Sequence, residues 1–240
     1  MKVRTCSVAG MFYPRDPHHL EQLVAGYLKA RLPLVGVRGI ISPHAGYPYS
    51  GAVAGEAFSA LDPEFSGTFV VVGPSHRGYL TCASAIPWET PVGIVDVDTA
   101  FVEELEIEVD EFSHQGEHSL EVQMPFIANL AGRIGKARKR TGREIRIVAS
   151  SDFSHYVPEG VARGNDLYAI EALKDLDTDE FYRRVEERGV SACGYGPIAT
   201  LCLAGKDMGA SKGELLTYRT SGDVTGDLEE VVGYAAIAVM

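Results

Sequence analysis

The sequence has 240 residues, of which 45% are hydrophobic and 23% charged. A chain of this length buries roughly three quarters of the surface that its unfolded form exposes, so it needs no disulfides or structural metals to fold. With 22 lysines and arginines against 33 aspartates and glutamates, the formal net charge is −11. Such a surface repels a phosphate backbone, so we expect no nucleic-acid partner. The one basic cluster, from Lys136 to Arg143, is interpreted as a solvated loop.

Other sequence features indicate a cytoplasmic protein. There is no apolar run of about 18 residues, so no membrane span is expected. The N-terminal residues lead directly into a polar stretch, unlike a signal peptide. The four cysteines form no C-x-x-C pair, and we expect them to be reduced.

Short β-type runs alternate with amphipathic stretches, which predicts an α/β fold with one layered sheet and helices on both faces. Pro125 lies inside one helical stripe, so that helix is expected to be kinked or to begin near the proline. With no repeat or linker, residues 1–240 are predicted to form a single domain. In chain order, we expect a helix over 18–30, a strand over 37–42, a helix over 51–61, strands over 68–73 and 81–86, helices over 99–105 and 119–131, a strand over 145–150, helices over 159–173, 178–188 and 196–208, and strands over 214–220 and 231–239.

Three of the predicted strands lead from buried apolar residues, through small or proline residues, to a histidine. These histidines are His44, His76 and His155, and the last follows Asp152 by three positions. In parallel α/β sheets, ligand sites lie beyond the carboxyl ends of the strands. The repeated pattern therefore predicts a site that contains several imidazoles.

Imidazole-rich sites suit borderline transition metals such as Fe, Cu and Zn, whereas Mg and Ca prefer oxygen ligands. A further ligand must come from elsewhere, and Cys193 is the best thiol candidate. It precedes a predicted helix start, where the positive end of the helix dipole would favour the thiolate. The other three cysteines are interpreted as packing residues.

The segment from His114 to His118 reads H-x-x-E-H, which is formally an inverted zinc-protease motif. That mechanism needs a stable helix, and Gly116 interrupts it. We instead expect a loop that leads into the next helix, with His118 directed at the site and His114 exposed.

Taken together, these motifs resemble the Memo family, known in prokaryotes as protein B of the AmmeMemoRadiSam system. The likeness runs essentially from end to end. The matching motifs are Ala9-Gly10-Met11-Phe12-Tyr13-Pro14, Ser42-Pro43-His44-Ala45-Gly46-Tyr47, Gly73-Pro74-Ser75-His76, Glu117-His118-Ser119-Leu120-Glu121, Ser151-Asp152-Phe153-Ser154-His155, Cys193-Gly194 and Val232-Gly233-Tyr234-Ala235-Ala236.

The resemblance implies a fold similar to that of class III extradiol ring-cleaving dioxygenases, which use non-haem Fe(II). It also implies that an iron or copper ion is held by His44, His76 and Cys193. His118, Asp152 and His155 would then be acid/base or supporting groups in the same pocket. A radical SAM protein and an AMMECR-type protein are the implied partners.

The implied ligand set differs from the two histidines and one carboxylate of those dioxygenases, so the likeness does not carry catechol cleavage with it. One hypothesis is a redox enzyme in which His155, oriented by Asp152, moves a proton, because free imidazole titrates near pH 6.5. A second is a binding module that recognises a peptide, a small molecule or a partner protein through the same pocket. A third is zinc hydrolysis with Asp152 or Glu117 as general base. Whether the protein forms a homodimer stays open.

Overall fold

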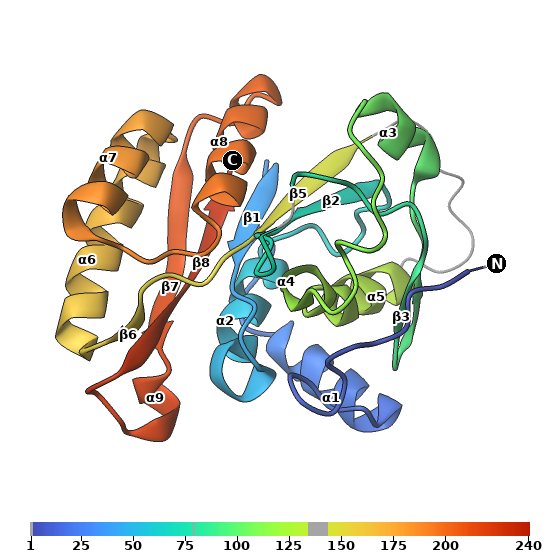
Figure 1. Cartoon of the computed structure of the whole chain (residues 1–240), viewed down its shortest axis with the longest axis horizontal. Coiled ribbons are helices and arrows are strands. Elements are labelled where there is room, and N and C mark those ends of the chain that lie inside the picture. Colours follow the sequence, from blue (N-terminus) through green and yellow to red (C-terminus); the bar gives the residue numbers. More distant parts are fainter. Residues whose placement is uncertain (1, 79, 134–143) are drawn as a thin grey trace.

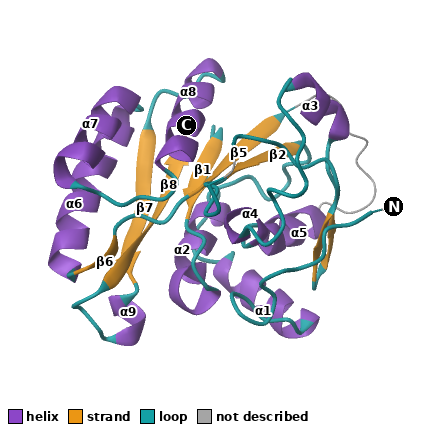
Figure 2. Ribbon diagram, in the orientation of Figure 1, coloured by secondary structure: helices purple, strands orange, loops and turns teal. Residues whose placement is uncertain are grey.

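A mixed six-stranded sheet runs through the middle of the protein (Figures 1 and 2). The computed structural model describes residues 2–78, 80–133 and 144–240. Within these residues the strand order is β2 (Thr68–Val72), β5 (Ile145–Ser150), β1 (Gly39–Ser42), β8 (Val231–Val239) and β6 (His155–Val157), and β7 (Gly213–Thr220) also pairs with β8. β2, β5 and β1 are parallel to one another, whereas β8 is antiparallel to its neighbours. The predicted α/β class is confirmed.

The pleat of the strands divides the core between the two faces of the sheet. Ile40 packs into one core cluster and Ile41 into the other, because successive side chains of a strand point to opposite faces. The helices on the first face are α1 (Pro17–Tyr27), α2 (Tyr47–Ser59) and α5 (Met124–Arg133). Those on the second are α6 (Glu159–Glu171), α7 (Thr178–Arg188) and α8 (Tyr195–Asp207) (Figure 1). Helices therefore cover both faces, as predicted.

The strand predicted over 81–86 is wrong. Ala83 forms a single bridge with Val109, and the only hairpin nearby in the described chain joins β3 (Trp88–Thr90) to β4 (Gly93–Val95). The side chains of residues 81–86 are mostly small, so they can bury little apolar surface. The Glu111 carboxylate accepts hydrogen bonds that a partner strand would otherwise accept. It accepts hydrogen bonds from the Ser84 hydroxyl and from the Ala85 backbone N–H.

Proline positions explain the helix boundaries that differ from expectation. α2 begins four residues earlier than predicted, because Pro48 can occupy the first turn, where a missing N–H costs nothing. The expectation that the helix over 119–131 is kinked or begins near Pro125 is confirmed: α5 begins at Met124, with Pro125 as its second residue, and α4 (His118–Glu121) is a separate short helix. α7 has the predicted bounds, with Asp177 accepting a hydrogen bond from the N–H of Glu180.

The remaining short elements are α3 (Thr99–Glu104), a 3₁₀ turn (Ala172–Asp175) and α9 (Gly222–Thr225). Among the helices described, none is both long and apolar enough to cross a bilayer. The basic cluster within 134–143 lies outside the described residues.

Candidate metal centre

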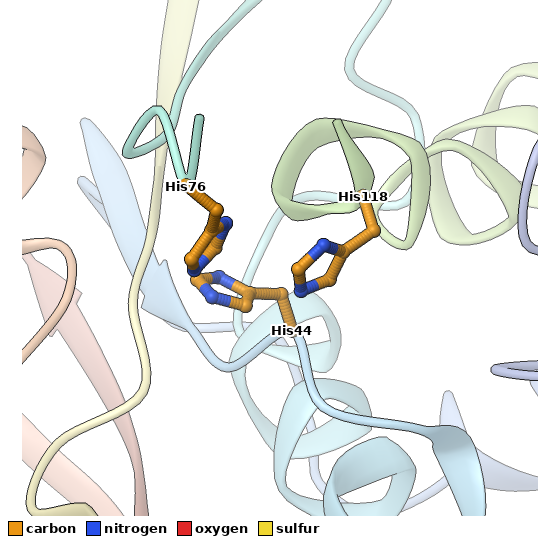
Figure 3. Close-up of side chains that lie close together, drawn as sticks. All are labelled: His44, His76 and His118. Atoms are coloured by element: carbon orange, nitrogen blue, oxygen red, sulfur yellow. The ribbon is translucent and has the colours of Figure 1, made fainter. Parts of the chain in front are cut away.

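The loops after β1 and β2 converge at the carboxyl edge of the sheet with the start of α4. They place His44, His76 and His118 so that one donor nitrogen from each ring lies within 4.8 Å of the other two. Figure 3 shows the three rings turned toward one another. Their centroids are 5.2 Å apart for His44 and His76, 5.5 Å for His44 and His118, and 4.5 Å for His76 and His118. The predicted meeting of imidazoles is therefore present, and it includes a third ring.

His44 forms the buried floor of the cluster, with 1% of its surface exposed. Its backbone N–H donates to Oδ1 of Asp152 over 2.9 Å, and its Nδ1 lies 2.9 Å from the hydroxyl of Ser150. Burial lowers the pKa of His44 to about 4, although the Asp152 carboxylate opposes the shift. The ring is therefore neutral near pH 7, which is the form that can bind a metal.

His76 forms the open side of the cluster and is held by Glu117. The two Glu117 oxygens accept hydrogen bonds from the His76 backbone N–H and from Nδ1, over 2.8 and 2.9 Å. Burial would raise the pKa of Glu117, but the hydrogen bonds from His76 and from the Ser119 N–H lower it to about 2. The hydrogen bond between the His76 ring and the Glu117 carboxylate raises the pKa of His76. Because a carboxylate can only accept, Nδ1 carries the proton and Nε2 is left free to act as a ligand.

His118 is the first residue of α4, and Glu117 is the N-cap of this helix. Gly116, with φ of +75°, allows the chain to turn into the helix. The His118 ring packs 4.8 Å from the ring of Phe12, and burial and the neighbouring His76 lower its pKa. The predicted loop into a helix is confirmed. The expectation that His114 is exposed is wrong, since it is buried and its Nδ1 lies 2.8 Å from the Asp110 carbonyl oxygen.

Cys193 borders the cluster through His44. Its Sγ lies 3.3 Å from Nε2 of His44 and 3.7 Å from the Asp152 carbonyl oxygen. Burial raises the pKa of the thiol to about 12, and the nearby Asp152 charge acts in the same direction. Burial therefore favours the protonated thiol over the thiolate that a position before a helix start predicts.

Asp152 does not orient His155. The backbone N–H of His155 donates to the Ser191 hydroxyl over 2.8 Å, and its Nδ1 lies 3.0 Å from the Ser191 carbonyl oxygen. Because a carbonyl can only accept, Nδ1 is protonated and Nε2 is the basic atom of the ring. Asp152 instead supports His44.

Sequence reasoning missed three supporting residues. Glu117 was predicted only as a candidate general base and as part of the H-x-x-E-H and Glu117–Glu121 motifs, and no role was predicted for Gln123 or Ser191. Gln123 is fully buried and donates to the Pro43 carbonyl and to Ser150. A glutamine inside a predicted helix is a weak signal, because only the fold shows that its side chain reaches the carboxyl ends of two strands.

Comparison with known proteins matches the whole chain to one family. A family model described as Memo-like protein covers residues 4–138 and 128–238. A MEMO1 family protein from Methanosarcina barkeri is 38% identical over 266 residues, which span 99% of this chain and all (100%) of that protein. Another from Methanococcoides burtonii is 40% identical over 266 residues, with 99% and 100% covered. A third, from Nitrosopumilus maritimus, is 38% identical over 272 residues, with 98% of both chains covered. The chain belongs to the Memo family.

Proposed function

We propose that this Memo-family protein is a metal-dependent oxidoreductase that binds iron or copper at His44 and His76. The observation that carries the proposal is the group of three imidazole nitrogens within 4.8 Å of one another, drawn from His44, His76 and His118. Three imidazole nitrogens with the Cys193 sulfur next to one of them suit Fe, Cu or Zn better than Mg or Ca. The donor set therefore fits the kind of metal that the family resemblance implies.

Two side chains compete for the third ligand position. His118 is neutral near pH 7 because its pKa is lowered, and it already lies with the other two imidazoles. The Cys193 sulfur lies next to Nε2 of His44. Its thiol would have to lose a proton in order to bind a metal ion. We expect His118 to be the better ligand for the resting ion and Cys193 to be the ligand that strengthens binding at alkaline pH.

Iron or copper, when bound, would supply an electron-transfer step. The chain's own contribution is proton transfer by His155, whose basic Nε2 is set by the Ser191 carbonyl. Hydrolysis with Glu117 as base is disfavoured, because His76 and Ser119 already occupy both of its oxygens.

Metal content after purification without oxygen or chelator tests this function. We expect nearly one iron or copper per chain in the wild type and in His19→Ala, an exposed histidine on α1 that serves as the matched control. The variants His44→Ala and His76→Ala should lose the metal. His155→Ala should keep it but lose turnover, because it moves protons rather than holding the ion.

Other outcomes would contradict the proposal. Zinc alone, together with esterase or peptidase activity, would favour hydrolysis. No bound metal even after reconstitution would favour a module that binds a peptide or partner protein through this pocket. Association with radical SAM and AMMECR-type proteins is a separate proposal that rests on the family resemblance, and co-purification with each would test it.

A further inference from the structure

A chain of uncharged polar side chains lies buried next to Nδ1 of His44. It consists of Ser42, Gln123 and Ser150, each with 0% of its surface exposed. Ser42 and Ser150 are the last residues of β1 and β5 and pair with each other, and Gln123 lies between α4 and α5. A buried polar chain of this kind is stable only if each donor meets an acceptor.

The orientation of the Gln123 amide is fixed by its neighbours. Its Nε2 lies 3.0 Å from the Pro43 carbonyl oxygen and 2.9 Å from the Ser150 hydroxyl. Its Oε1 accepts a hydrogen bond from the Ser42 hydroxyl over 3.0 Å. A flipped amide would place two acceptor oxygens against each other at Pro43, so both amide protons are committed.

The single proton of Ser150 is committed as well. Its hydroxyl lies 2.7 Å from the Ser119 carbonyl oxygen, which can only accept. Ser150 therefore donates to Ser119 and accepts from Gln123, which leaves one lone pair for Nδ1 of His44 at 2.9 Å. That contact is a hydrogen bond only if Nδ1 is the donor.

We propose that Ser150, held by Gln123, is a positioning residue that fixes His44 as the Nδ1–H tautomer before any ligand binds. Nε2 of His44 then carries the lone pair, 3.3 Å from the sulfur of Cys193. The device differs from the carboxylate behind His76, because a hydroxyl orients the ring without favouring its charged form. The tautomer follows from the hydrogen bonds alone, and only its effect on metal affinity rests on the proposed function.

Long-range ¹H–¹⁵N correlation spectra of the metal-free protein near neutral pH test the tautomer directly. The His44 signals are identified by their absence in His44→Gln. We expect one tautomer in the wild type, with Nδ1 protonated and Nε2 bare. In Ser150→Ala the two tautomers should mix. Gln123→Met should cause a smaller change in the same direction, because the hydroxyl loses one of its anchors. A wild-type ring protonated at Nε2 would overturn the proposal without any variant.

Competition titration with Zn²⁺ and a chromophoric chelator gives the second readout. Removing a partner of a metal-binding histidine lowers metal affinity by roughly 10- to 100-fold, and we expect that loss in Ser150→Ala. The matched control is Ser59→Ala, another buried serine, which donates to the Gly55 carbonyl within α2. If Ser150→Ala keeps the Nδ1–H tautomer and the affinity of Ser59→Ala, the proposal is wrong. If the wild type shows the tautomer but binds no metal, the tautomer assignment stands and the proposed function fails.

Discussion

His44 is neutral at physiological pH because it is buried, with a pKa near 4 against 6.5 for a free imidazole. The unfolded chain takes up a proton at this residue below about pH 6.5, whereas the folded chain does so only near pH 4. Acidification through this window therefore favours the unfolded state. His118, whose pKa is also lowered, contributes in the same direction, and His76, whose pKa is raised, opposes it.

The His44 contribution can be measured from the pH dependence of unfolding in chelator. The shift in its pKa corresponds to about 3 kcal/mol of unfolding free energy lost between pH 6.5 and 4. His44→Gln lacks this titration, so its stability should fall less steeply than that of the wild type over the same window. His19→Gln, an exposed control, should follow the wild type. Parallel curves for the wild type and His44→Gln would show that burial does not set the charge of His44.

Individual site residues differ in how far sequence could identify them. A buried strand followed by a histidine is a local signal, and it predicts His44 and His76, which lie together in the cluster. The role of His155 stays a prediction. That His118 lies close enough to His44 and His76 to share a metal with them could not be predicted from local sequence, because their distance depends on how the chain between them folds. The partners of the rings, Glu117, Ser150 and Ser191, are ordinary polar residues whose roles come only from the folded geometry.

At the level of elements, Gly194, the N-cap residue of α8, packs directly against the end of β5. A Cβ added at Gly194 would lie 2.4 Å from the Ser151 Cβ and 2.5 Å from the Ser150 carbonyl oxygen. Only glycine allows this approach, which brings Cys193 next to the residues that hold His44. A Cβ at Gly196, two residues further on, would meet nothing within 4 Å.

These two glycines form a matched pair for mutation. Gly194→Ala should lower the free energy of unfolding by about 1–3 kcal/mol, because the contact with β5 becomes overpacked. It should also weaken metal binding, since Ser150 is displaced. Gly196→Ala should stay within about 0.5 kcal/mol of the wild type. Urea unfolding with a Zn²⁺ titration of each variant checks both effects, and equal behaviour of the two variants would rule out the close packing of α8 on β5.

Elements with a strong periodic pattern were predictable, and those defined by side-chain contacts were not. The parallel strands β1, β2 and β5 and the capped helix α7 lie where the sequence places them. The run over 81–86 carries the same β-type composition, yet its Ser84 hydroxyl and Ala85 N–H donate to the Glu111 carboxylate, 27 and 26 residues further along the chain. A contact between residues so far apart in the chain cannot be predicted from the local sequence pattern.

For the whole molecule, the order of the strands brings the site together. Because β1 lies between β5 and β8 and β2 lies beyond β5, the loops after three parallel strands meet at one edge of the sheet. α4 then adds His118 from the first face, and the loop that leads into α8 adds Cys193 from the second. Both core clusters therefore support the same site, with His44 buried and His76 on the solvent side.

Anomalous diffraction from crystals loaded with Fe(II) without oxygen tests the central claim most directly. Data collected on both sides of the iron absorption edge locate the ion without reference to activity. The account predicts one peak within bonding distance of His44 and His76, with His118 or Cys193 completing the ligand set. A peak elsewhere in the molecule, or none between these histidines in fully loaded crystals, would contradict it.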